Sequence, residues 1–289
     1  MLHKINPENS FATNVLEAGA YFNNEASNPE QLPIHMATAH NVEDCADLLK
    51  RYEKGDYCYN RYRNPNREAL GELMSYVEGG EFSLACSSGM GSIFLAIMSN
   101  VQEGDHIVYD KVLYGESIEI FTKILSKFGV TSTPCTFTDL DSVKAAVQPN
   151  TKLFYGETVC NPLCAVADLK AISDIAHENG AILVIDNTFM TGALAQPLKL
   201  GADLVVNSLT KFANGHSDAV VGCITGPKDM VMKCHANQQL VGSQADPFSS
   251  WLVCRGLRTL DLRVKKQADN AKALAEFFEE SPYVKRVFY

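Results

Sequence analysis

The chain has 289 residues, of which 46% are hydrophobic and 20% charged, and its formal net charge is −9. This composition is that of a folded globular protein, and the acidic balance argues against a nucleic-acid surface, which needs a basic face. The polar start lacks the apolar core of a signal peptide, and no apolar run is as long as a membrane span. We therefore expect a cytoplasmic protein that binds neither membrane nor nucleic acid. Its nine cysteines are expected to be reduced thiols without a metal site.

The first 60 residues are expected to form an irregular N-terminal arm. Asparagines and prolines interrupt this segment, and both favour turns over regular elements. These residues include Asn23, Asn24, Asn28, Pro29 and Pro33. Such a segment needs another surface to lie on, and a neighbouring subunit is the expected one.

From residue 67 onward the pattern becomes regular. Helical periodicity is expected over 67–77, up to the paired glycines Gly79 and Gly80. Short apolar segments then alternate with helical ones. The expected strands are 82–86, 106–109, 130–134, 152–155, 181–185 and 204–206. The expected helices run to residue 98 and over 117–128, 140–147 and 169–178, with later ones from 229 and over 247–280. This alternation predicts a mainly parallel sheet covered by helices on both faces, with ligands at the carboxyl ends of its strands.

Asp186 follows the buried segment 182–185. At the carboxyl end of a central strand, a carboxylate points into the ligand crevice, where it can partner a protonated ring nitrogen or a metal. A helix cap or a turn is the alternative explanation for an aspartate in this position.

Lys211 follows the next strand, after Ser208 and Thr210. We expect this lysine in a deep, partly desolvated place, because desolvation favours the neutral amine that a Schiff base needs. The two hydroxyls are candidate ligands of a phosphate. The alternative is a lysine on a surface turn, which is where most lysines lie.

Small residues occupy the junction between strand 82–86 and the following helix. Ser88, Gly89 and Met90 place backbone N–H groups at a helix N-terminus, an arrangement that binds anions, although small residues also simply permit a tight turn. The sequence lacks the Gly-x-Gly-x-x-Gly, Walker A and Gly-x-Ser-x-Gly motifs. We therefore set aside a nicotinamide oxidoreductase.

Further polar and aromatic residues follow or precede these elements. Tyr59 and Arg61 precede the first long helix, where an arginine can clamp a phosphate. Tyr114 offers an aromatic face to a planar ring. Glu157 and Asn161 follow a strand. Each of these residues alone fits a solvated loop, but together they are expected to converge on one crevice.

With these residues in place, the chain resembles the Cys/Met-metabolism family of pyridoxal-phosphate-dependent enzymes. This family includes methionine γ-lyase, cystathionine γ-lyase, cystathionine β-lyase, cystathionine γ-synthase and O-acetylhomoserine sulfhydrylase. The most specific signal is Asp186-Asn187-Thr188 followed downstream by Thr210-Lys211. The matching segments are 59–66, 86–93, 114–115, 157–162, 186–189, 208–218 and 247–260.

The resemblance implies a role for each of these residues. Lys211 would bind pyridoxal phosphate as a Schiff base and move protons, and Tyr114 would stack on the ring and act as acid or base, so both are expected to be catalytic. Asp186 would pair with the ring nitrogen. The expected cofactor-binding residues are Tyr59, Arg61, Ser88, Gly89, Met90, Tyr114, Glu157, Asn161, Asp186, Ser208, Thr210 and Lys211. No metal is expected.

Tyr59 and Arg61 would reach the phosphate of the neighbouring subunit, which implies a homodimer with shared sites or a homotetramer. Several positions depart from the family pattern, among them residues 159–160 and 245–247. Glu116 stands where methionine γ-lyases carry cysteine, Asn207 where relatives often have His or Gln, and Phe212 where they often have Tyr. These changes leave the cofactor residues intact and the substrate undecided.

The resemblance also implies an α/β fold of the aspartate-aminotransferase type (PLP fold type I), with a mostly parallel seven-stranded sheet between helices. Residues 1–60 are expected to be the arm that contacts the neighbouring subunit, and 61–250 the cofactor-binding domain. Residues 251–289 would begin a C-terminal domain that is otherwise absent and that carries, in relatives, the arginine for the substrate carboxylate.

The expected activity is that of a carbon–sulfur lyase. It would catalyse β- or γ-elimination from cystathionine, methionine, homocysteine or cysteine and release a thiol, ammonia and a 2-oxo acid. One alternative is γ-replacement, as in cystathionine γ-synthase or O-acetylhomoserine sulfhydrylase. The other is a truncated relative that binds the cofactor without turnover.

Overall fold

The computed structural model describes residues 6, 8–17 and 29–289. The predicted turn residues Asn23, Asn24 and Asn28 lie outside the described residues. The centre of the fold is a seven-stranded sheet with the order β1-β7-β6-β5-β4-β2-β3. Its strands are β1 (Phe82–Cys86), β2 (His106–Asp110), β3 (Thr131–Cys135), β4 (Thr151–Glu157), β5 (Ile182–Asp186), β6 (Leu204–Ser208) and β7 (Gly222–Gly226).

Most neighbouring strands are parallel, as predicted. Only β7 runs against its neighbours, β1 and β6, and it was not predicted, because its five residues start and end with glycine. The predicted α/β fold with a mostly parallel seven-stranded sheet is confirmed.

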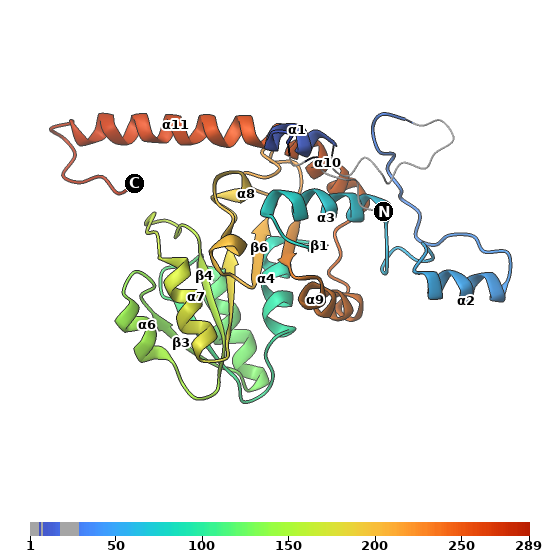
Figure 1. The fold of residues 1–289 in the computed structure, drawn as a ribbon, viewed down its shortest axis with the longest axis horizontal. Helices are drawn as coiled ribbons and strands as arrows, with labels where there is room; N and C mark the ends of the chain where they lie inside the picture. The colour runs from blue at the N-terminus through green and yellow to red at the C-terminus, as the bar shows by residue number, and fades with distance from the viewer. Residues whose placement is uncertain (1–5, 7, 18–28) are drawn as a thin grey trace.

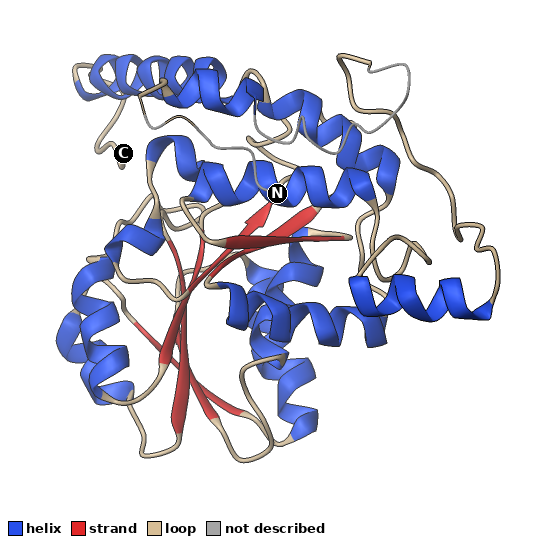
Figure 2. Ribbon diagram, turned by 45° about the vertical axis from the view of Figure 1, so that its right-hand side comes forward, coloured by secondary structure: helices blue, strands red, loops and turns tan. Residues whose placement is uncertain are grey.

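Both faces of the sheet are apolar, because successive side chains of a strand point to opposite faces. In β5, Val184 joins one buried cluster, whereas Leu183 and Ile185 join another. Helices therefore have to cover the sheet on both sides, and Figure 2 shows them there.

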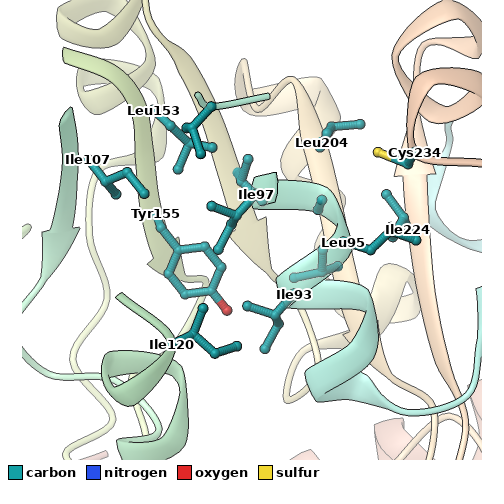
Figure 3. Close-up of a cluster of buried hydrophobic side chains, with 14 of the residues drawn as sticks. Ile93, Leu95, Ile97, Ile107, Ile120, Leu153, Tyr155, Leu204, Ile224 and Cys234 are labelled. Atoms are coloured by element: carbon teal, nitrogen blue, oxygen red, sulfur yellow. The ribbon is translucent and has the colours of Figure 1, made fainter. Parts of the chain in front are cut away.

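One face is covered by α4 (Gly89–Met98), α5 (Gly115–Glu119) and α9 (Lys228–Val241). Figure 3 shows Ile93 and Ile97 of α4 among Tyr155 and Leu204 from the strands. The other face is covered by α3 (Pro65–Glu78), α6 (Leu140–Ala146), α7 (Leu169–Glu178) and α10 (Pro247–Leu257).

The helix predicted over 117–128 is divided into three parts. After α5 come a π-helical turn, η2 (Ile120–Ile124), and a 3₁₀ turn, η3 (Leu125–Phe128). Phe121 lies between two aromatic rings of the core, with ring centroids 4.9 Å from Tyr109 and 5.3 Å from Tyr155. The wider π turn is consistent with Ile120 and Phe121, neighbours in sequence, both being buried.

The N-terminal arm, residues 1–60, was predicted to be irregular, but it contains two helices, α1 (Phe11–Glu17) and α2 (Cys45–Lys54). Asp44 caps α2 by accepting a hydrogen bond from the Asp47 amide at 2.8 Å, and Gly55 ends it in the left-handed region. Figure 1 shows α2 standing away from the sheet.

The boundary expected at residue 250 falls inside α10. This helix packs on α3 within the same buried cluster, so it is continuous with the sheet domain. The long α11 (Leu260–Glu279) follows and extends past the body of the molecule (Figure 1). The remaining short elements are α8 (Thr191–Leu194) and η4 (Pro197–Leu200). None of the described helices has the length and apolar character required to cross a bilayer.

Candidate active site

Asp186 is the last residue of β5, and its carboxylate is held from two directions. Oδ1 accepts a hydrogen bond from the Thr188 amide at 2.9 Å, and the Tyr155 hydroxyl donates to Oδ2 over 3.5 Å. Burial raises the pKa of Asp186, and the Thr188 and Tyr155 donors oppose that effect. A partly covered carboxylate of this kind can pair with a protonated ring nitrogen.

Glu157 ends the neighbouring strand β4, in register with Asp186. Its Oε1 accepts a hydrogen bond from the Tyr114 amide at 2.7 Å and its Oε2 one from the Asn161 amide at 3.0 Å. The carboxylate thus joins the loop after β2 to the loop after β4 and leaves the Tyr114 side chain exposed. Burial raises the pKa of Glu157 to about 7.

The start of α4 lies against the end of β6. Ser88 caps the helix by accepting a hydrogen bond from the Gly91 amide at 3.0 Å. The N–H groups of Gly89 and Met90 have no intrahelical acceptor at the first helical positions. A Cβ on Gly89 would lie 2.6 Å from the Ser208 Cβ and 2.9 Å from its Oγ, so only glycine lets this turn come so close to the serine hydroxyl. Backbone donors and a hydroxyl therefore meet in an anion cradle.

Thr210 and Lys211 follow Ser208 in a turn. The Thr210 hydroxyl is already bonded to the backbone of Val221, accepting from its N–H at 3.2 Å and donating to its oxygen at 3.4 Å. The side chain of Lys211 is exposed, so the prediction of a deep, desolvated lysine is wrong for this structure. The turn itself is packed, since Leu209 and Ala213 are buried on either side, but the Lys211 side chain remains exposed beside them.

Tyr59 and Arg61 are exposed, and they lie apart from Asp186 and Ser208. The Arg61 guanidinium donates to the backbone oxygen of Gln239 at 2.6 Å and lies over the ring of Tyr62. The backbone oxygen of Arg61 accepts from Gln244, which in turn bridges to Cys86 at the end of β1. The segment is therefore attached to the same edge of the sheet without contacting Ser208 among the described residues.

Sequence reasoning missed two residues of this site. Tyr155, which is fully buried, donates to Asp186. The Thr188 hydroxyl accepts from the Ser208 amide at 2.7 Å, while the Thr188 amide donates to Asp186. Thr188 thus connects the carboxylate to the anion cradle. Its only sequence signal was its position directly after Asp186-Asn187.

A hollow of about 410 Å³ lies in the arm, away from this cluster. It is lined by His40, Asp47, Lys50, Arg51, Lys54, Asp56 and Tyr57. Four of these residues belong to the projecting helix α2. We assign this hollow no part in the candidate site, which is made of the buried polar groups at the carboxyl edge of the sheet. In the described part of the chain, no group of three or more His, Cys, Asp or Glu side chains could hold a metal ion.

Comparison with known proteins identifies the family. The sequence model of the Cys/Met metabolism PLP-dependent enzymes matches residues 12–289. The chain belongs to this family. It is 38% identical over 284 residues to an L-methionine gamma-lyase of Porphyromonas gingivalis, covering 96% of this chain and 71% of the relative. With the cystathionine beta-lyase MetC of Bacillus subtilis it shares 40% identity over 238 residues, covering 82% of this chain and 61% of that relative.

The fold agrees with this assignment. The crystal structure of metB from Corynebacterium glutamicum superposes with a TM-score of 0.91 at 34% identity and covers 98% of this chain and 72% of that one. The family depends on pyridoxal phosphate, and the predicted family and cofactor are confirmed. The residues present also fit the cofactor, because the close approach of Gly89 to Ser208 leaves donors that could hold a phosphate and Asp186 has a carboxylate that could accept from a ring nitrogen.

Proposed function

We propose that this chain forms the cofactor site of a carbon–sulfur lyase that catalyses β- or γ-elimination from cystathionine, methionine, homocysteine or cysteine. The observation that carries the proposal is the convergence of Asp186, Glu157, Ser208 and the start of α4 on the carboxyl edge of the sheet, in a member of this family. The products would be a thiol or hydrogen sulfide, ammonia and a 2-oxo acid.

The cofactor, when bound, supplies a ring that withdraws electrons from the substrate. The N–H groups of Gly89 and Met90 and the Ser208 hydroxyl would hold its phosphate. Asp186 would keep its ring nitrogen protonated, and Asn161 would donate a hydrogen bond to its phenolic oxygen. Each of these contacts would orient the cofactor without moving a proton of the substrate.

We assign the proton transfers of the reaction to Lys211 and Tyr114. Lys211 would hold the cofactor through its amine, and once the substrate's amino group has displaced it, the freed amine would take the proton from the substrate Cα. In γ-elimination the same amine would pass that proton on and then accept a second one from Cβ. Partial burial, and then the nearby Glu116 carboxylate, raise the pKa of Tyr114. The Tyr114 hydroxyl therefore keeps its proton at neutral pH and can donate it to the departing sulfur.

The proposed assembly is a homodimer with shared sites or a homotetramer. Two features support it: the exposure of Tyr59 and Arg61, and their separation from the phosphate cradle of their own chain. An arginine suits this task because its guanidinium binds phosphate oxygens in a bidentate way.

The proposal is tested by a visible absorption scan of the purified protein with pyridoxal phosphate. Cystathionine, methionine, cysteine and O-acetylhomoserine are then added separately. A cofactor band that shifts with a thioether or thiol substrate, together with release of 2-oxo acid, is the expected result. A response to O-acetylhomoserine only when a thiol is also present would indicate γ-replacement instead. A band that no amino acid changes would contradict turnover and indicate a cofactor-binding chain.

A further inference from the structure

Glu78 occupies an unfavourable place for a carboxylate. It is the last residue of α3 and has 0% of its surface exposed. The carboxyl end of a helix carries partial negative charge, which repels another negative charge. Burial raises the pKa of Glu78 to about 8. Because a buried acid is costly, compensating contacts must hold it in place.

Those contacts are three N–H donors from segments distant in sequence. Asn187 Nδ2 donates to Glu78 Oε2 at 2.8 Å, while Asn207 Nδ2 at 3.1 Å and the Gly192 amide at 3.0 Å both donate to Oε1. Asn187 and Asn207 are themselves buried. A single carboxylate therefore joins the end of β5, the end of β6 and the start of α8.

The orientation of the Asn187 amide is fixed by contacts other than Glu78. Its Oδ1 accepts a hydrogen bond from the Thr158 hydroxyl at 2.7 Å, and its Nδ2 also donates to the Ala195 oxygen at 2.8 Å. The amide cannot rotate without losing both bonds, so it must present Nδ2 to Glu78. Glu78 is thus an obligatory acceptor in this network.

The approach of α8 to α3 is equally constrained. A Cβ on Gly192 would lie 1.9 Å from the backbone oxygen of Val77, the residue before Glu78. Only glycine permits the Gly192 amide to reach the carboxylate. The network thus depends on close backbone packing as well as on its side chains.

The two asparagines flank the residues of the cofactor site in sequence. Asn187 directly follows Asp186, and Asn207 directly precedes Ser208. Neighbouring side chains of a strand point to opposite faces, so Glu78 holds the two strand ends from the side opposite their functional neighbours. Those neighbours are the proposed partner of the ring nitrogen and the proposed ligand of the phosphate.

We infer that Glu78 is a positioning residue of the cofactor site, which holds Asn187 and Asn207 and thereby sets the spacing between Asp186 and Ser208. The inference rests on the proposed cofactor site at those two residues. Glu78 touches neither cofactor nor substrate and acts only through the two asparagines.

The test compares Glu78→Ala with Glu78→Gln. The alanine variant leaves the Asn207 Nδ2 and the Gly192 amide without an acceptor, whereas glutamine keeps the shape and one carbonyl oxygen. We expect Glu78→Ala to raise the dissociation constant for pyridoxal phosphate about tenfold or more, and Glu78→Gln to recover part of that loss. The measurement is a titration of the apoprotein with pyridoxal phosphate, followed by visible absorption.

A second readout separates positioning from general instability. The visible circular dichroism of bound pyridoxal phosphate, taken at saturation, reports its orientation and is expected to change in Glu78→Ala and in Asn207→Ala. The two substitutions should also be non-additive in the dissociation constant, because they break one contact. His106→Gln is the matched control, since it disturbs a buried polar network at the opposite edge of the sheet. It should lower the melting temperature and leave both cofactor readouts unchanged.

The outcomes distinguish the inference from the proposed function. If the unmodified chain does not bind pyridoxal phosphate, the proposed site and the inference both fail. If it binds, and Glu78→Ala, Glu78→Gln and Asn207→Ala all keep its affinity and circular dichroism, only the inference is overturned. Fully additive losses would also overturn it, because the two residues would then act separately. Should Glu78→Ala fail to fold, Glu78→Gln and Asn207→Ala decide the question by the same two readouts.

Discussion

The two edges of the sheet both bury polar side chains, but of different kinds. At the amino edge, His106 is fully buried between two hydroxyls, with its ring nitrogens 2.8 Å from Thr151 Oγ1 and 2.8 Å from Thr133 Oγ1. At the carboxyl edge, Asp186 and Glu157 are carboxylates whose pKa values burial raises. The His106 network is closed, with both ring nitrogens already bonded, whereas the carboxyl edge retains carboxylates able to gain or lose a proton.

This difference teaches that buried polarity by itself does not indicate function. His106 and its threonines come from adjacent strands and satisfy one another, which stabilises the sheet and leaves nothing to bind a ligand. Glu157 and Asp186 receive backbone donors from the loops that follow the strands, and Tyr114 remains exposed and Asp186 partly exposed. Raised pKa values next to a partly open edge are the features that favour an active site.

The largest effect is expected from Lys211→Ala. If the carboxyl edge holds the cofactor through this amine, the visible absorption of bound pyridoxal phosphate should disappear and activity should be lost. Far-ultraviolet circular dichroism and the melting temperature should remain those of the unmodified chain, because the side chain is exposed. A retained cofactor band at its original wavelength would contradict the role of Lys211.

The next largest effect is expected from Arg61→Ala. If a second chain completes the carboxyl edge, loss of this guanidinium should weaken retention of pyridoxal phosphate about tenfold. Mixing Arg61→Ala and Lys211→Ala chains, at a pyridoxal phosphate concentration too low to load the Arg61→Ala sites, should then restore some activity, since one site of the mixed dimer would have both residues. Absence of restoration in verified mixed dimers would mean that sites are not shared.

A smaller effect is expected from Glu157→Gln, measured as stability against pH. The folded pKa of about 7 lies above the usual value of 4.5, so the folded state retains a proton that the unfolded state has lost. The unmodified chain should therefore lose stability as the pH rises from 4.5 to about 7, and the glutamine variant should not share this loss. The difference in unfolding free energy between the unmodified chain and the variant, measured by urea unfolding, should change by about 1–3 kcal/mol between about pH 5 and pH 8. A pH-independent difference would contradict the raised pKa.

The smallest effect is expected from His106→Gln. Here the unmodified chain should lose stability as the pH falls, whereas the effect of Glu157 appears as the pH rises. Burial lowers the pKa of His106 below its usual 6.5, so the unfolded state binds the proton first as the pH falls. The unmodified chain should lose about 1 kcal/mol or less on acidification below pH 6.5, and this loss should be absent in the variant. Affinity for pyridoxal phosphate should stay unchanged, and a weakened affinity would break the distinction between the two edges.

Local pattern was enough to predict most of the sheet. The strand predicted over 82–86 and the helix predicted over 169–178 have the bounds observed for β1 and α7. Apolar periodicity is a property of neighbouring residues, so it survives without knowledge of the fold. The strand β7 was missed for the same reason, because its short glycine-bounded segment has a weak local pattern and depends on β1 and β6 for its formation.

The sequence by itself determined the family and the cofactor, because these follow from short motifs at strand ends. Only the tertiary structure decided how that edge is held together. Glu157 bonds to the Tyr114 amide across 43 positions, and Glu78 to Asn187 across 109. The structure also placed the Lys211 side chain in the open. Contacts at such separations depend on the packing of whole helices and strands, which no local pattern encodes.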